Sequence, residues 1–394
     1  MVSLIGVLTF LSTVPGLNVL SLGYLLEASG RIVRSGRWRD GLIGIRTFAR
    51  IGSIAVGTFL MLVPLRFLSS LANDADLAAV GSPAAKAWRF ALFVLTIIML
   101  VHIATSWFAG GKLRHFFWPL LVPYRVGIWL TFGLAGKICR PLIERYLPLL
   151  AHDLYAPMPL ASWFPPATVW EGIRKGNGYL DARDAVWEFL VRLRLPHYFW
   201  LGLRGYAGAL LWLAIPSLLL LGGTKLPPGP GQFIVGWIGA IALMWVVSYL
   251  PFLQAHFAAE NRWGAMFERS AIKENFRRAP LSYWLAMLVT VAFAIPLYLF
   301  NIENILRGLI WIPGVVFVVS IYPARLLAGW VVGYGRRRQK PSWLIVRWTA
   351  RLGLWPVIAI YVLIVYLSQF TRWYGEVSFF EQHAFLLPVP FLGL

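Results

Sequence analysis

The chain has 394 residues, of which 59% are hydrophobic and only 13% charged, and its net charge is +20 at pH 7. Soluble domains are about 45–50% apolar and roughly 25% charged, so this composition excludes a soluble globule. Lipid must replace water over much of the exterior. The single cysteine, Cys139, excludes an intrachain disulfide framework and a cysteine-based metal cluster.

Long apolar runs predict an all-α integral membrane protein with about eight transmembrane helices, in a range of seven to ten. The clearest run, Phe233–Leu253, carries no charge, and the chain is expected to leave it near Pro251 for a basic segment that ends at Pro280. The other predicted spans are Val2–Leu26 (kinked at Pro15), Ile51–Leu71, Phe90–Trp107, Leu201–Leu221, Ser282–Leu299, Leu309–Val332 and Leu352–Phe370.

The segment between the third and fourth spans is expected to stay at the cytoplasmic surface. Prolines 119 and 123 and Arg125 interrupt its apolar part and leave Val126–Gly136, which is too short to span. Asp181–Leu195 has apolar residues at helical spacing, which predicts an interfacial amphipathic helix. The predicted organisation is therefore a first membrane unit at 1–108, an insert at 109–198, and a second membrane unit with an aromatic tail at 199–394.

The distribution of basic residues predicts the orientation. The loops between apolar runs that we assign to the inside hold 28 of the 36 Lys and Arg residues, whereas the outer segments hold five. By the positive-inside rule both termini lie outside the membrane. Anionic lipid headgroups at the cytoplasmic face are the expected partners of this charge, and nucleic acid is not.

The titratable and nucleophilic residues do not form a recognisable catalytic or metal-binding pattern. The six histidines are scattered, and the S-x-x-K match Ser270–Lys273 lacks its companion motifs, so it is interpreted as a solvated helix face. We predict no catalytic residue, no cofactor and no metal site.

Polar residues at membrane depth are the candidate contact sites: Asn18, His102 and Arg325. For His102, a hydrogen bond between helices is favoured over metal binding. Arg325 is expected roughly 12 Å below the inner surface. Our hypothesis is that it pairs with Glu27 or Glu260, the two acids that topology places at that level; extension of the side chain to the headgroups is the alternative.

Two further patterns concern helix packing. Small residues recur four apart in three of the predicted spans, which favours close helix approach: Gly205 and Ala209, Gly236 and Ala240, Ser53 and Gly57. A faint echo also relates Pro15-x-x-Asn18 to Pro251-x-x-Gln254 and the charged residues that follow each, as an internal repeat or by chance.

Several strings resemble an uncharacterised family of bacterial multi-pass membrane proteins that is defined by a domain of unknown function. They include GYLLEASGRIVRSGRWRDG at 23–41, YLPFLQAHFAAENRWGAMFE at 249–268 and PARLLAGW at 323–330. The resemblance covers most of the chain, with 126–178 as an expected insertion. It implies the fold and the membrane location, but it brings no activity and no site residue.

Three functions are compatible with these patterns. The leading hypothesis is a non-enzymatic integral protein of the bacterial inner membrane. Its role would be structural or in assembly, with a membrane protein as a possible partner. The second is a transporter or lipid-handling permease, for which the prolines in the spans would break helices around a substrate. A membrane-embedded enzyme has the least support.

Overall fold

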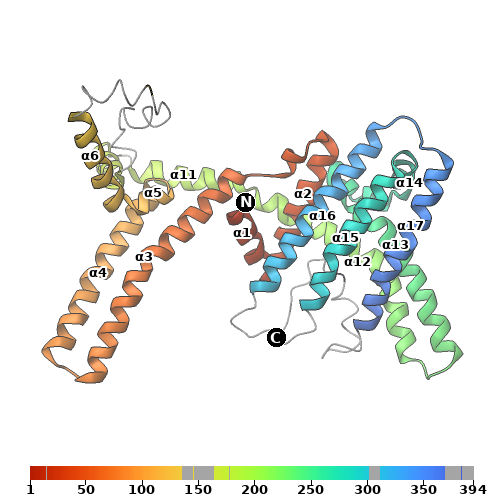
Figure 1. The fold of residues 1–394 in the computed structure, drawn as a ribbon, viewed down its shortest axis with the longest axis horizontal. Helices are drawn as coiled ribbons and strands as arrows, with labels where there is room; N and C mark the ends of the chain where they lie inside the picture. The colour runs from red at the N-terminus through yellow and green to blue at the C-terminus, as the bar shows by residue number, and fades with distance from the viewer. Residues whose placement is uncertain are drawn as a thin grey trace. The chain divides into compact units, whose positions relative to one another are not determined.

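In the computed structural model of the chain, residues 1–14, 16–134, 145, 164–176, 178–300, 311–368 and 383 are described. All regular elements in these ranges are helices (Figure 1). Their contacts divide the chain into two compact units. Residues 1–45 pack with residues 193–394, and residues 46–192 form the second unit. The division predicted at 108 and 198 followed chain order and is not the one that these contacts make.

The multi-pass helical fold is confirmed. Six described helices are long and apolar enough to cross a membrane, and the bent pair α14 (Arg269–Arg278) and α15 (Pro280–Phe300), which meet at 112°, gives a seventh if it counts as one span. The six are α3 (Ile45–Ala78), α4 (Pro83–Phe108), α12 (Leu195–Lys225), α13 (Pro230–Glu260), α16 (Trp311–Arg337) and α17 (Leu344–Ser368). These seven correspond to seven of the eight predicted spans.

The first predicted span is the exception. Val2–Leu26 is not one helix, because the chain forms α1 (Val2–Thr13) and then α2 (Asn18–Ser35). Helix α2 continues nine residues past the predicted end at Leu26. It stops at Gly36, which has a left-handed φ of 76°. In this conformation the Gly36 N–H donates a hydrogen bond to the Ile32 carbonyl, which is a common glycine C-cap. The residues taken as the start of a basic loop are therefore helical.

Helix α2 is the centre of its unit. Thirteen of its 18 residues are buried, and it packs against α1, α12, α13 and α16. Glycines bring the backbones together, because a Cβ added at Gly23 would overlap the Tyr198 carbonyl of α12. A Cβ at Gly30 would lie 2.6 Å from the Ala258 carbonyl of α13, and one at Gly329 of α16 would lie 2.5 Å from the Ser29 carbonyl. The core is thus built on backbone contact.

The predicted small-residue pairs are used unevenly. Gly205 faces the Leu26 side chain, and Gly57 faces the ring of Phe116. Gly236, however, has no atom within 4 Å of where its Cβ would lie. Its backbone nevertheless lies against α12, because a Cβ added at Gly223 would be 3.2 Å from the Gly236 nitrogen. A second close approach of the same two helices is at Gly239, whose added Cβ would be 2.9 Å from the Leu220 nitrogen.

Two prolines that were expected to end or interrupt a helix do not do so. Helix α13 continues through Pro251 to Glu260, and nearly all of its last turns are buried. Helix α6 (Trp118–Leu134) continues through Pro123, so the interruption predicted there was wrong. Its 17 residues keep it outside the set of helices long enough to span. Neighbouring groups in a packed or lipid environment can satisfy the carbonyl that each proline leaves free.

The two chain exits at the ends of α2 and α13 share a backbone conformation. Gly36-Arg37-Trp38 and Asn261-Arg262-Trp263 each place a left-handed residue first (φ 76° and 53°) and an extended arginine second. The tryptophan then begins a 3-10 helix: η1 (Trp38–Gly41) and η2 (Trp263–Phe267). This register supports an internal repeat. In this alignment Glu27 corresponds to Phe252, whereas the echo noted in the sequence related it to Glu260.

The second unit contains the α3–α4 hairpin, α5 (Leu113–Phe116), α6, α10 (Pro165–Arg174) and α11 (Gly178–Leu193). The amphipathic helix predicted at Asp181–Leu195 corresponds to α11. None of its residues is buried by protein, and Phe189 and Leu193 are half-exposed. Its salt bridges join neighbours on its own polar face, Arg183 to Asp184 and Arg192 to Glu188. Membrane must therefore cover its apolar face if that face is to be dry.

We expect the substitutions Phe189→Lys and Leu193→Lys together to detach α11 from the bilayer, because each puts a charge on its apolar face. Limited trypsin treatment of inverted vesicles should then cleave α11 faster than in the unchanged chain. The matched control places the lysines on the polar face, Asp184→Lys with Glu188→Lys, and adds the same number of cleavage sites. Equal protection of both variants would show that the apolar face is not inserted.

Candidate functional site: a buried polar network in the helix core

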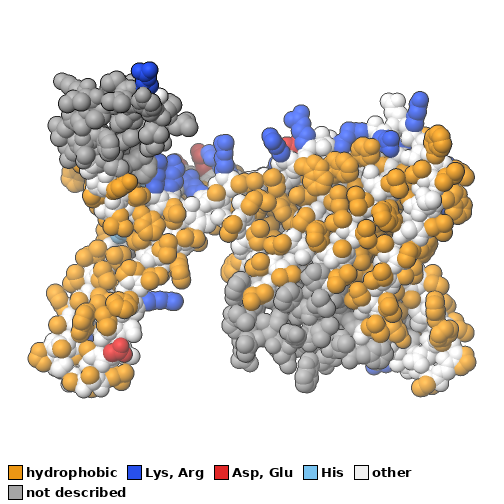
Figure 2. All heavy atoms as spheres, in the orientation of Figure 1, with side chains coloured by type: hydrophobic (Ala, Val, Ile, Leu, Met, Phe, Trp, Pro, Cys, Tyr) orange, Lys and Arg blue, Asp and Glu red, His pale blue; other side chains and the backbone are white. Residues whose placement is uncertain are grey.

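One end of the first unit collects its charged residues. The ends of α2, α13 and α16 meet the start of α12 there, because Arg34 of α2 donates to the Ala258 and Ala259 carbonyls of α13, and His197 of α12 lies 3.4 Å from Glu27. We call this the basic end. Figure 2 shows the Lys and Arg side chains of this unit gathered along it, with apolar side chains covering most of the helices beyond.

Glu27 is the most enclosed acid of the basic end. Its side chain is buried, 2.9 Å from Arg31 and 3.2 Å from Arg34, with His197 at 3.4 Å. A buried carboxylate is tolerated only where charges and donors surround it, and here three cationic or basic groups do so. Because Arg34 also holds the end of α13, the Glu27 cluster joins α2, α12 and α13.

A second cluster is centred on His256 of α13. Its Nε2 lies 2.8 Å from Glu268, and Arg336 of α16 donates to its Nδ1. Because arginine has no acceptor, Nδ1 must accept and Nε2–H must donate, which is the neutral tautomer. Arg336 also pairs with Glu260 at 2.9 Å. The hydrogen bond from His256 is the main reason that the pKa of Glu268 lies below its ordinary value, so Glu268 is ionised at neutral pH.

Arg325 lies deeper in the core and is only 5% exposed. Its Nη1 donates to Oε1 of Gln254 on α13, a fully buried side chain. The contact that the structure shows for Arg325 is thus with an amide, and the pairing with Glu27 or Glu260 stays a prediction. Glu27 is held by Arg31 and Arg34 of its own helix, and Glu260 is held by Arg336. An uncharged amide supplies the acceptor at the depth of Arg325.

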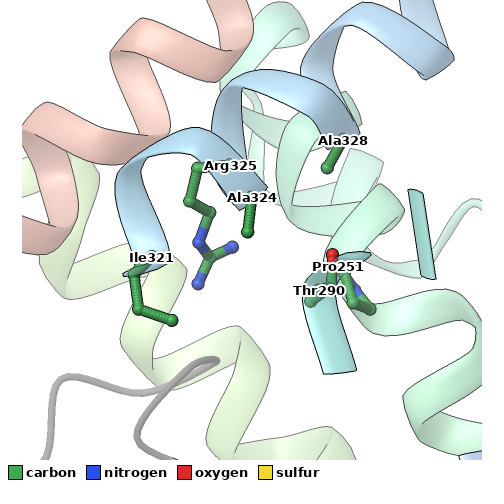
Figure 3. Close-up of a pocket in the computed structure, with 6 residues that line it drawn as sticks. All are labelled: Pro251, Thr290, Ile321, Ala324, Arg325 and Ala328. Carbon is green, nitrogen blue, oxygen red and sulfur yellow. The ribbon is translucent and has the colours of Figure 1, made fainter. Parts of the chain in front are cut away.

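A small pocket lies beside Arg325. It is lined by Pro251 of α13, Thr290 of α15 and four residues of α16, namely Ile321, Ala324, Arg325 and Ala328. In Figure 3 the arginine side chain extends from α16 into this space, with Pro251 and Thr290 on its other side. The pocket has room for about one water molecule. A solute larger than water does not fit in this conformation.

The other predicted polar contacts do not join this pocket. Asn18 is buried at the start of α2, nine residues and roughly 13 Å along the helix from Glu27. His102 belongs to the second unit. Its Nε2 lies 2.7 Å from the Phe116 carbonyl of α5 and must donate to it. This is the hydrogen-bonded role that was favoured for His102 over metal binding.

Sequence reasoning missed Gln254, His256, Glu268 and Arg336. Their signal was present, because the segment QAHFAAE contains neither glycine nor proline and continues an apolar helix without a break. This signal was overlooked because Pro251 was taken as the end of the helix. Likewise the string EASGRIV carries small residues at the positions where α13 and α16 approach α2.

The network can fix the positions of the helices that it joins. No three His, Cys, Asp or Glu side chains among the described residues are grouped so as to hold a metal ion. Ser270 and Lys273 are exposed on α14, as expected for a solvated face. The Glu27 cluster joins α2, α12 and α13, and the His256 cluster joins α13 to α16. Together these ion pairs and hydrogen bonds form a structural clasp across four helices. Comparison of the chain with family models, with curated proteins and with solved structures finds no match.

Proposed function

We propose that this chain is a non-enzymatic polytopic protein of the bacterial inner membrane with a structural or assembly role. The observation that carries the proposal is the close packing of the described core: glycine contacts bring α2 against its neighbours, and the pocket at Arg325 has room for about one water molecule. A rigid core with neutralised polar groups suits a scaffold. Membership of the uncharacterised family that the sequence resembles is part of the same proposal.

A transporter or lipid-handling permease is the second candidate. It is favoured by one observation, the presence of Pro251 and Arg325 side by side at the pocket, since transporters often place ionisable groups beside irregular helices. Opening the pocket would require α13, α15 and α16 to separate. The clasp between Arg336 of α16 and the end of α13 opposes this movement.

The proposal places the basic end in the cytoplasm, against anionic headgroups. Lys340 is exposed beyond α16 at this end, and Lys225 is exposed at the opposite end of α12. In a Cys139→Ser background we expect an impermeant thiol reagent added to intact cells to label Lys225→Cys and to leave Lys340→Cys unlabelled. Permeabilised cells should label both. Labelling of Lys340→Cys in intact cells would reverse the topology.

The assembly role itself is tested by affinity purification from native membranes in mild detergent, with quantitative mass spectrometry. An unrelated polytopic protein with the same tag is the control. The proposal predicts a membrane protein recovered in fixed stoichiometry, whose native complex changes size in cells that lack this chain. Recovery of lipid and background proteins alone, with every native complex unchanged, would contradict it.

A further inference from the structure

The α3–α4 hairpin is almost uncovered by protein. In the 18-residue apolar stretch of each helix, the share of residues buried by protein is 6% in α3 and 11% in α4. The same share is 67% in α16. The two backbones rarely come within 8 Å of each other. Their polar links lie towards the ends of α4: Trp107 donates to Thr58 at 3.0 Å, and Arg89 pairs with Asp76 at 2.6 Å. A pair of helices that packs so loosely in lipid would gain packing contacts, and so stability, from a third helix.

One face of α3 carries a cation within the apolar run. Residues at helical spacing form an exposed stripe, which we call the Arg66 stripe: Phe59, Leu62, Val63, Arg66 and Ser70. Arg66 is seven residues, roughly 10 Å, from the polar Asn73 and fifteen residues, roughly 22 Å, from Ile51. No described acid forms a salt bridge with Arg66. Within the hairpin, Asp76 is paired with Arg89 instead. An arginine at such a depth is costly unless it is matched.

We propose that the Arg66 stripe docks a transmembrane helix of another membrane protein that carries an Asp or Glu at the depth of Arg66. The inference deepens the proposed assembly role and rests on it. The partner's carboxylate would accept hydrogen bonds from the guanidinium, and its apolar face would cover Phe59, Leu62 and Val63.

A second copy of this chain fits the stripe less well. Among the described acids, Glu27 lies within a helix core and is enclosed by Arg31 and Arg34. Asp74 and Asp76 lie beyond the apolar run, eight and ten residues from Arg66. A lipid phosphate also fits less well, since it lies at the surface and leaves the loosely packed hairpin without a third helix. Charge and packing together therefore point to a foreign helix with a carboxylate.

The test uses the full chain in neutral phosphatidylcholine vesicles, labelled at Lys86→Cys in a Cys139→Ser background. The probe is a single-span leucine–alanine helix with one Glu at the matched depth, and the control probe carries Gln there. We expect energy transfer to report binding of the Glu probe about tenfold tighter than that of the Gln probe. Arg66→Met should abolish the difference, and Arg66→Lys should keep it. Gel filtration checks that each variant is folded.

Equal binding of the two probes, or an unchanged preference in Arg66→Met, would overturn the proposal and leave extension to the lipid phosphates as the account of Arg66. Energy transfer between two labelled copies that is lost in Arg66→Met would overturn it in favour of self-association. If the probe test fails while purification still recovers a stoichiometric partner, the assembly role stands and only this surface is wrong.

Discussion

Replacing Gly202 by alanine is expected to lower the free energy of unfolding by about 3 kcal/mol, at the upper end of the range for overpacked cores. A Cβ at this position of α12 would overlap the Val19 carbonyl of α2, which is a backbone atom and cannot turn away. The two helices must then separate, and α12 loses its backbone contact with α2, the centre of the unit. Thermal unfolding in detergent, followed by the folded fraction on gel filtration, measures the loss.

Gly236→Ala is the matched control for Gly202→Ala. Gly236 also lies inside a spanning helix, but no atom comes within 4 Å of its added Cβ. Alanine there should leave stability unchanged or raise it by up to about 1 kcal/mol, because alanine favours helix over glycine. Equal melting temperatures for the two alanine variants would mean that α2 and α12 do not meet at Gly202.

The second large effect is expected at Gln254. Gln254→Leu keeps a side chain of similar volume but removes a hydrogen-bond acceptor of the buried Arg325. We expect this loss to lower the free energy of unfolding by about 2–3 kcal/mol. Arg325→Met should be costly alone yet should add little to Gln254→Leu, because the contact is already lost. A double-mutant cycle on unfolding in detergent should therefore give a coupling energy of about 1–2 kcal/mol.

The same cycle separates this contact from the pairing that topology suggested. Arg325→Met combined with Glu27→Gln, or with Glu260→Gln, should be additive within about 0.5 kcal/mol, because each acid has its own cationic partners. Strong coupling to either acid, with additivity for Gln254→Leu, would restore the ion pair and remove the amide contact.

Hydropathy predicts this fold well where one long uncharged run makes one helix. Seven spans were predicted for that reason. In the structure α3 extends past both predicted ends, and α17 begins eight residues before its predicted start. The method failed at α2. The charged residues Glu27, Arg31 and Arg34 looked like a loop, although both arginines pair with Glu27 and the small residues between them pack in the core.

The candidate site was half predictable. Arg325 was chosen as a cation at membrane depth by counting residues along one helix, and the structure buries its side chain in the helix core. Its partner was not, since charge-based reasoning considers only acids and Gln254 has no charge. The His256 cluster was missed because Pro251 was taken as a helix end, whereas a proline within a packed helix need not break it.

The closed core is tested most directly by thiol accessibility at the pocket. Ala324→Cys and Ala328→Cys place a thiol in the lining of the Arg325 pocket, and Lys340→Cys at the exposed basic end is the positive control. In proteoliposomes of the Cys139→Ser chain, a small polar thiol reagent applied to both faces should label Lys340→Cys and spare the two pocket cysteines until detergent denaturation exposes them. Labelling of either pocket cysteine in the native protein, at a rate that a solute slows, would show an open path and contradict the structural role.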